Sequence, residues 1–272
     1  MKPTDIGFVT FAQNTQKVDY LKLAYLQALN CKKLHPRFGY AVIVDYPTSK
    51  LIEKKHEEIF DYIIYKPLDL VHPMGNEWQV YYHTPFYETI KLESDLLFTR
   101  NIEHWIDAFR QLNIVLSHGC KNYQGNLATN RFYRKFIDEN HLPDVYNGLM
   151  YFRKHEETEI FFKTAQRIYQ NWSTIKDKLN YCFEELPSTD SLYALSALLY
   201  GVEKCTLPHL DFINFVHMKP KIQGWNEEAP WHEVVMYEQD NDIIRIHNLN
   251  QYYPVHYYSK NFPVDNLIKQ YE

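Results

Sequence analysis

The first half of the chain alternates between short apolar runs and stretches with apolar residues at helical spacing. Apolar runs rich in β-forming residues are typical of buried strands. They predict five strands, over Ile6–Phe11, Tyr40–Val44, Tyr62–Tyr65, Glu88–Leu92 and Ile114–Ser117. The helical spacing predicts helices over Val18–Leu29, Ser49–Phe60 and Ile102–Leu112. This order implies right-handed crossovers, so we expect an α/β fold with a mainly parallel central sheet flanked by helices.

The second half is less regular. Asn147–Phe152 predicts a strand, Glu156–Leu179 a long helix and Ser191–Tyr200 a short helix. The C-terminal part, with clusters of Pro, His, Trp and Tyr, is typical of loops that wrap a site. No linker, low-complexity tract or internal repeat divides the chain, so we expect a single domain over residues 1–272.

Composition narrows the function classes. The chain has 272 residues, 45% of them hydrophobic, which is enough for a sizeable core and excludes general disorder. A net charge of −5 argues against binding nucleic acid through bulk charge alone. Only 8 residues are Gly, and neither G-x-G-x-x-G nor G-x-x-x-x-G-K-[ST] occurs, so a glycine-rich phosphate loop is not expected.

The four cysteines are widely spaced and form no C-x-x-C pair, at Cys31, Cys120, Cys182 and Cys205. This spacing excludes a zinc ribbon or redox motif and favours reduced, mostly buried thiols. The sequence has no signal-peptide pattern and no apolar stretch long enough for a transmembrane segment. We therefore expect a cytoplasmic protein.

The most informative segment is Glu93-Ser94-Asp95, which directly follows a predicted strand. Residues two apart on an extended chain project to the same side. Two carboxylates at the carboxyl end of a strand suit a hard divalent cation such as Mg²⁺ or Mn²⁺, and ligands bind at that edge of such sheets. The alternative is a solvent-exposed turn.

This segment resembles the acid-x-acid motif of nucleotide-sugar-dependent glycosyltransferases with the GT-A fold. Lys91 to Phe98 follows that pattern, with Glu93 in place of the usual first Asp. The resemblance implies that Asp95 is a catalytic metal ligand, and that Glu93 is a second ligand that also binds the donor. It further implies donor contacts from Thr10 and Phe11 in the first strand. Asp45, at the end of the second strand, would lie near the base or ribose.

Two further segments resemble family 8, the glycogenin-like retaining enzymes. Tyr146 to Phe152 is similar to one of their strands, and Phe215 to Pro220 is similar to their C-terminal His…Lys-Pro-Trp element. The resemblance implies that His217 completes the metal shell and that Lys219 meets the donor phosphate. His247, at the end of another strand-like run, is the alternative ligand.

Asp190 lies just before a predicted helix, in Ser188-Thr189-Asp190. One interpretation is a helix N-cap formed by any of these three residues. The other makes Asp190 a catalytic residue near the anomeric carbon of the donor sugar, where a carboxylate would stabilise positive charge in the transition state.

Basic and aromatic residues alternate from Arg131 to Phe136. Arg131, Tyr133 and Arg134 could contact phosphates and bases, although an amphipathic helix turn explains the pattern equally well. With Asn147 they form our predicted acceptor-binding set. The composition resembles that of bacteriophage or AT-rich bacterial proteins, so a hydroxymethylated base flipped out of phage DNA is one expected acceptor, placing the enzyme in the host cytoplasm. A bacterial surface glycan is the other.

Together these features predict a metal-dependent glycosyltransferase that moves a hexose or pentose from a nucleotide sugar to an acceptor hydroxyl. We expect a UDP-sugar donor, Mn²⁺ or Mg²⁺ as cofactor, and retention of the anomeric configuration. Residues 1–118 would form the nucleotide-sugar-binding half, and residues 119–272 the acceptor-binding half with a C-terminal closing segment. Two alternatives are a nucleotide-sugar-binding protein without catalytic activity and a metal-dependent nucleotidyltransferase.

Overall fold

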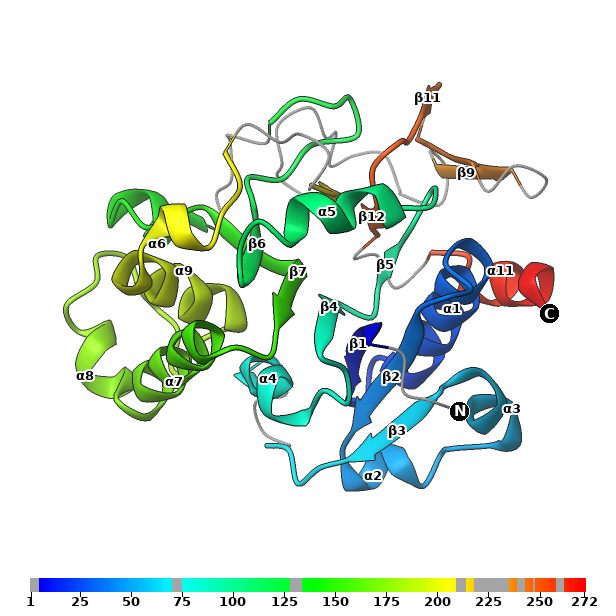
Figure 1. Ribbon diagram of the computed structural model, residues 1–272, viewed down its shortest axis with the longest axis horizontal. Helices are drawn as coiled ribbons and strands as arrows, with labels where there is room; N and C mark the ends of the chain where they lie inside the picture. Colours follow the sequence, from blue (N-terminus) through cyan, green and yellow to red (C-terminus); the bar gives the residue numbers. More distant parts are fainter. Residues whose placement is uncertain are drawn as a thin grey trace.

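The computed structural model describes residues 5–69, 75–127, 134–208, 214–217, 235–238, 243–246, 248–257 and 262–272. A six-stranded sheet in the order β3-β2-β1-β4-β7-β6 lies at its centre (Figure 1). Its strands are β1 (Ile6–Ala12), β2 (Gly39–Val44), β3 (Tyr62–Tyr65), β4 (Glu88–Leu92), β6 (Ile114–His118) and β7 (Val145–Arg153). All run parallel except β7, which is antiparallel to β4 and β6. The predicted α/β fold with a mainly parallel sheet is confirmed.

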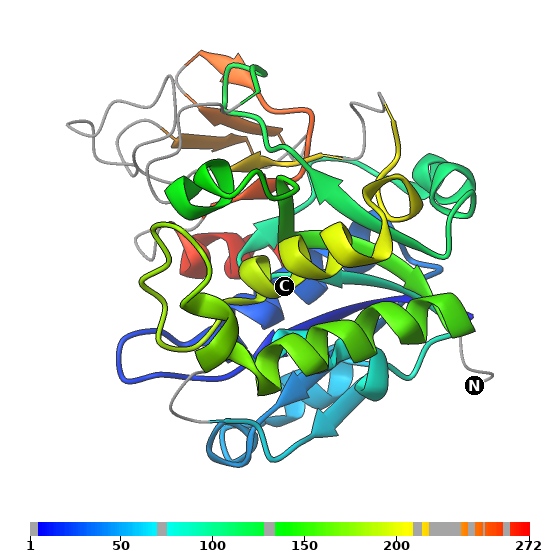
Figure 2. The same ribbon diagram turned by 90° about the vertical axis from the view of Figure 1, so that its left-hand side faces the viewer.

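Alternate residues of the central strands build two cores, one on each face of the sheet. In β2, Tyr40 and Val42 join one core, which includes the buried side of α1 (Tyr20–Leu34). Ala41 and Ile43 join the other. That second core includes α7 (Glu156–Gln170) and α9 (Thr189–Tyr200), which lie side by side (Figure 2). A strand buried on both faces is a continuous apolar run, and that pattern made β2 predictable.

The predicted strands match the observed ones closely, whereas three predicted helices are divided. Ser49–Phe60 contains the end of α2 (Tyr46–Ser49), a break, and then α3 (Lys54–Ile59). Asp45 caps α2 by accepting a hydrogen bond from the Thr48 amide, and Pro47 lies in the first turn, so the helix begins before the predicted residue.

The other two helices are interrupted for local reasons. Ile102–Leu112 forms a 3-10 turn, Glu103–Trp105, before α5 (Ile106–Phe109). Glu156–Leu179 breaks at Asn171, whose side chain and backbone N–H both bond to carbonyl groups of α7. The chain then continues as α8 (Trp172–Lys176). A short helix, α4 (Val80–His83), precedes β4, and α6 (Lys135–Glu139) precedes β7.

A small second sheet joins three distant parts of the chain. β5 (Leu96–Leu97) follows β4 directly, and β12 (Val255–His256) pairs with it in antiparallel orientation. β8 (Val216–His217) pairs with β12 in parallel orientation. A third sheet holds β9 (Val235–Glu238), β10 (Ile243–Ile246) and β11 (Leu249–Asn250). The C-terminal helix α11 (Val264–Tyr271) packs against α1.

All four cysteines are unpaired in the structure, and three of them are buried. Among the helices of the described ranges, none is long and apolar enough to cross a membrane.

Candidate functional site

A cavity of about 750 Å³ opens beyond the carboxyl ends of β1 and β4. Because β7 is antiparallel, its amino-terminal residues face the same cavity. Helix α9 and the loop before it form the opposite wall. Six carboxylates from different parts of the chain line it: Glu77, Glu93, Asp95, Glu184, Glu185 and Asp190.

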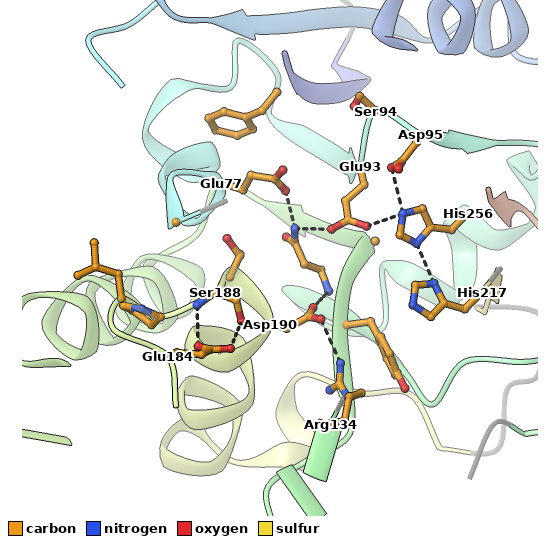
Figure 3. A pocket seen from close by; sticks show the side chains of 18 of the residues that line it. Glu77, Glu93, Ser94, Asp95, Arg134, Glu184, Ser188, Asp190, His217 and His256 are labelled. Atoms are coloured by element: carbon orange, nitrogen blue, oxygen red, sulfur yellow. Dashed lines mark hydrogen bonds and ion pairs between the residues drawn. The ribbon is translucent and has the colours of Figure 1, made fainter. Parts of the chain in front are cut away.

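Glu93, Asp95 and His256 meet at one side of this cavity (Figure 3). Nε2 of His256 lies 3.1 Å from Oε2 of Glu93 and 3.0 Å from Oδ1 of Asp95. One ligand atom from each of the three residues lies within 4.8 Å of the others. Two carboxylates and an imidazole are ligands that Mn²⁺ and Mg²⁺ accept, so this donor set fits a divalent cation.

The local fold explains how these side chains come together. After β4, the Leu96 amide bonds to the Glu93 carbonyl and closes a tight turn that aims both carboxylates into the cavity. The Glu93 amide donates to the Gly148 carbonyl of β7, 3.0 Å away. A Cβ atom at Gly148 would lie 2.9 Å from the ring of Phe215, so the absence of a side chain at this position makes room for that ring.

The structure places His256, and not the predicted ligand His217, beside the two carboxylates. His217 lies behind His256, with the two Nδ1 atoms 2.9 Å apart and the rings stacked at 4.7 Å. His256 therefore lies between His217 and the carboxylates. When Nε2 of His256 serves as the ligand, its Nδ1 carries the proton and donates to His217, which fixes the tautomer. The alternative residue, His247, lies outside the described residues.

Burial affects the ionisation of Glu93. It raises the pKa of this carboxyl group above its ordinary value, and the neighbouring carboxylates of Glu77 and Asp95 add to the rise. The charges of His256 and Lys91 oppose it. A bound cation would relieve the repulsion among these carboxylates.

Asn147, at the start of β7, connects the surrounding groups. Its Nδ2 donates to Glu93 Oε1 at 3.1 Å and also to Glu77. Its Oδ1 accepts from Nζ of Lys91 at 2.7 Å, and its backbone amide donates to Asp190 at 2.7 Å. Asn147, predicted to bind the acceptor, thus forms hydrogen bonds to several of the charged residues around the site.

Asp190 lines the cavity from the first turn of α9. The helix N-cap is Ser188, whose side chain accepts from the Ser191 amide, so Asp190 is not the cap. Its two oxygens are held separately, one by the Asn147 amide and the other by Arg134 at 3.1 Å. A rigid carboxylate facing the cavity can stabilise nearby positive charge.

Arg134, another predicted acceptor-binding residue, is buried and lines the cavity. It is 2% exposed, forms ion pairs with Asp144 and Asp190, and lies 3.8 Å over the ring of Tyr146. Its guanidinium group therefore lies inside the protein, and its predicted contact with the acceptor stays a prediction. Arg131 and Tyr133 lie outside the described residues.

The predicted donor-binding residues of the first half divide into two groups. Phe11 lines the cavity. Thr10 is buried, and its hydroxyl donates to the Leu92 carbonyl within the sheet, away from the cavity. Asp45 caps α2 and accepts from Gln13, which lines the cavity, so any influence of Asp45 passes through Gln13. Lys219 lies outside the described residues.

Sequence reasoning missed His256 and Glu77. A signal for His256 existed. The spacing of His217 and Lys219 is compressed relative to the family 8 element that they resemble, and His256 is followed by a lysine, Lys260, at a wider spacing. Glu77 had no comparable signal, since it lies in a 3-10 turn of three residues, Glu77–Gln79.

Comparisons with known proteins bear on the fold. No family model matches the chain, and no curated protein matches it. The bifunctional glycosyltransferase WbbM superposes with a TM-score of 0.55 at 10% identity, over 98% of this chain and 50% of that one. An active-site mutant of LgtC gives 0.52 at 10% identity, over 97% and 94%. The galactosyltransferase LgtC with donor and acceptor sugar analogues gives 0.50 at 9% identity, over 97% and 95%. This chain therefore has the GT-A fold that these glycosyltransferases share.

Proposed function

We propose that this chain is a divalent-metal-dependent glycosyltransferase that transfers a sugar from a nucleotide-sugar donor, with UDP as the nucleotide we expect. The observation that carries the proposal is the Glu93–Asp95–His256 cluster at the carboxyl end of β4, facing the cavity of about 750 Å³. The shared GT-A fold supports it.

The residues of the chain have separable roles in this proposal. Glu93, Asp95 and His256 would hold Mn²⁺ or Mg²⁺, which when bound supplies Lewis-acid stabilisation of the diphosphate leaving group. Phe11 and Gln13 would contact the nucleotide from the end of β1. Asp190, held by Arg134 and the Asn147 amide, would face the anomeric carbon and stabilise the positive charge that develops there.

We further propose a neutral glycan as acceptor in preference to DNA. The charged residues that the described part of the chain contributes to the cavity are mainly carboxylates, and Arg134 is already paired with two of its neighbours. Such a wall repels a polyanion. Retention of the anomeric configuration, which the resemblance to family 8 implies, and a cytoplasmic location, which the unpaired thiols favour, complete the proposal.

The deciding experiment is donor turnover. The native chain is incubated with Mn²⁺ and a panel of UDP-, GDP-, TDP- and CMP-sugars, and released nucleotide is measured beside Asp95→Ala. We expect slow release from one donor and loss of release in the variant. Transfer to oligosaccharides and to hydroxymethylated DNA then identifies the acceptor, and the proton coupling constant of the product reports its configuration.

Each alternative function predicts a different experimental outcome. Metal-dependent nucleotide-sugar binding without turnover, in the presence of both acceptor classes, would favour a binding protein. Formation of a nucleotide sugar from a nucleoside triphosphate and a sugar 1-phosphate, with release of inorganic pyrophosphate, would favour a nucleotidyltransferase. Absence of any metal-dependent nucleotide binding in calorimetry would overturn the proposal.

A further inference from the structure

Glu77 presents one carboxylate oxygen to the cavity. Its Oε2 accepts hydrogen bonds from Nζ of Lys91 and from Nδ2 of Asn147. Its Oε1 accepts none from the residues that the structure describes. The side chain is 19% exposed and lines the cavity beside Glu93 (Figure 3). Glu77 is therefore anchored on one oxygen and open to a ligand on the other.

Lys91 determines which carboxylate oxygen of Glu77 is anchored and which is open. Its side chain is fully buried in the sheet, with 0% exposure, where an unpaired ammonium would be very costly. Its three acceptors are Glu77, the Asn147 carbonyl at 3.0 Å and Asn147 Oδ1 at 2.7 Å, one for each N–H of the ammonium group. This arrangement also orients the Asn147 amide, so that Nδ2 must face the two carboxylates of Glu77 and Glu93.

Glu77 lies next to the candidate metal centre. The same nitrogen atom, Nδ2 of Asn147, contacts Glu77 and Glu93, so the two carboxylates are neighbours. A nucleotide sugar carries its sugar on the terminal phosphate. A diphosphate at the Glu93–Asp95–His256 cluster would therefore bring the attached sugar toward Glu77.

We propose that Glu77 binds hydroxyl groups of the transferred sugar and thereby helps to determine donor specificity, with Lys91 as its positioning residue. The inference rests on the proposed glycosyltransferase function. An ionised carboxylate accepts hydrogen bonds from hydroxyl or amide N–H groups and repels a second carboxylate. The site would thus take neutral sugars and disfavour uronic acids.

Glu77→Gln separates this role from a purely structural one. Lys91 and Asn147 both donate to the inner position, so the amide oxygen of the glutamine must occupy it. The amide NH₂ group then faces the cavity, where it donates instead of accepting. The side-chain shape is kept while the hydrogen-bonding character toward the sugar is reversed.

The test compares calorimetric affinities, with Mn²⁺ present, for UDP, UDP-glucose and UDP-glucuronate, or for the corresponding set of the nucleotide that the donor panel selects. In the native chain we expect the neutral sugar to add affinity over the free diphosphate, and the uronate to bind more weakly than the neutral sugar. In Glu77→Gln we expect the affinity for the neutral donor to fall about 10- to 100-fold, with affinity for the diphosphate unchanged. The discrimination against the uronate should shrink.

Glu184→Gln is the matched control. Glu184 also lines the cavity, but both of its oxygens already accept hydrogen bonds, from the Ser188 amide and hydroxyl and from the Ser191 hydroxyl. This variant should lower thermal stability and leave the sugar contribution intact. If Glu77→Gln fails to fold because Lys91 stays charged, the double variant Glu77→Leu/Lys91→Met removes both charges together and should lose the same sugar contribution.

The outcomes distinguish failure of the proposed function from failure of the role of Glu77. A native chain that binds neither diphosphate nor nucleotide sugar overturns the proposed function. A native chain that binds both equally, or a Glu77→Gln variant that keeps the native difference between them, overturns the role of Glu77 alone. Equal losses for UDP and UDP-glucose also overturn it, because they indicate a general disturbance of the site.

Discussion

The two ends of strand β4 both carry a glutamate, and their surroundings differ. Glu88 at the amino end accepts hydrogen bonds from two guanidinium nitrogens of Arg110, Nη2 at 2.8 Å and Nε at 2.9 Å, and from the Tyr151 hydroxyl at 2.7 Å. Glu93, just beyond the carboxyl end, contacts Asn147 and His256, and no Lys or Arg among the described residues pairs with it directly.

The pKa values of the two carboxyl groups move in opposite directions. Burial by itself would raise the pKa of Glu88, but hydrogen bonds from Arg110 and Tyr151 lower it below the ordinary 4.5. Burial raises the pKa of Glu93, and neighbouring carboxylates reinforce the rise. A carboxylate by itself therefore does not identify a functional site. The amino end is already neutralised by its own protein partners, whereas the carboxyl end would gain most from an added cation.

Removing Asp95 should have the largest effect. Asp95→Ala deletes a carboxylate of the candidate metal cluster, so under the proposed function we expect sugar transfer to fall by at least about 100-fold while the fold is retained. Turnover with saturating donor and circular dichroism check the two halves of this statement. Glu88→Gln, at the other end of the strand, is the control and should keep native turnover. Native activity in Asp95→Ala would show that the two ends do not differ in function.

Adding Mn²⁺ should stabilise the native chain measurably. At a free concentration of 100 times its dissociation constant, binding contributes about 2.7 kcal/mol to the free energy of unfolding. For a chain of this size that raises Tm by about 5 °C, and EDTA should reverse the rise. Differential scanning calorimetry should find the shift in the native chain and in Glu88→Gln, and lose it in Asp95→Ala. A shift that survives in Asp95→Ala would assign the metal to another site.

Changing His217 should weaken metal binding without abolishing it. His217→Phe keeps a ring stacked on His256 but removes the Nδ1 partner that fixes its tautomer. Loss of such a supporting contact typically lowers metal affinity 10- to 100-fold. Calorimetric titration with Mn²⁺ measures this, and His217→Gln, which restores a hydrogen-bond acceptor, should recover part of the affinity. Equal affinity in His217→Phe and the native chain would remove His217 from the site.

The sequence predicted strand β4 and the two acidic residues after it, but not the histidine that lies beside them. Its apolar run set the bounds of the strand at Glu88–Leu92, and the acid-x-acid spacing pointed to Glu93 and Asp95. Local patterns of this kind depend only on neighbouring residues. His256 was missed because its place depends on β12, a strand of two residues that pairs with β5 and β8 far away in the chain. So short a strand has no periodicity to read.

The predicted helix bounds were wrong for a related reason. Apolar spacing over Ser49–Phe60 does not show where a cap or a proline starts a helix, and the observed starts of α2 and α3 depend on side-chain contacts of Asp45 and Glu53. Arg134 looked like a surface residue because its sequence neighbours are basic and aromatic. Its burial follows from ion pairs with Asp144 and Asp190, and the spacing of residues along the chain cannot reveal the second of these.

Glu88→Gln should give the smallest effect and a different kind of effect, on stability instead of activity. The variant loses the ionic part of a bidentate contact with Arg110, which is itself half exposed, so we expect the free energy of unfolding at pH 7 to fall by about 1–2 kcal/mol.

Because the folded-state pKa of Glu88 lies below 4.5, this contribution is present above pH 4.5 and is lost as the pH falls through the folded-state value. Urea unfolding at several pH values should therefore find the two proteins converging below pH 4.5. Glu159→Gln, which breaks an exposed pair with Lys163 on α7, is the control and should change stability by about 0.5 kcal/mol or less. A gap between Glu88→Gln and the native chain that persists unchanged in acid would mean that shape, not charge, holds the amino end of β4.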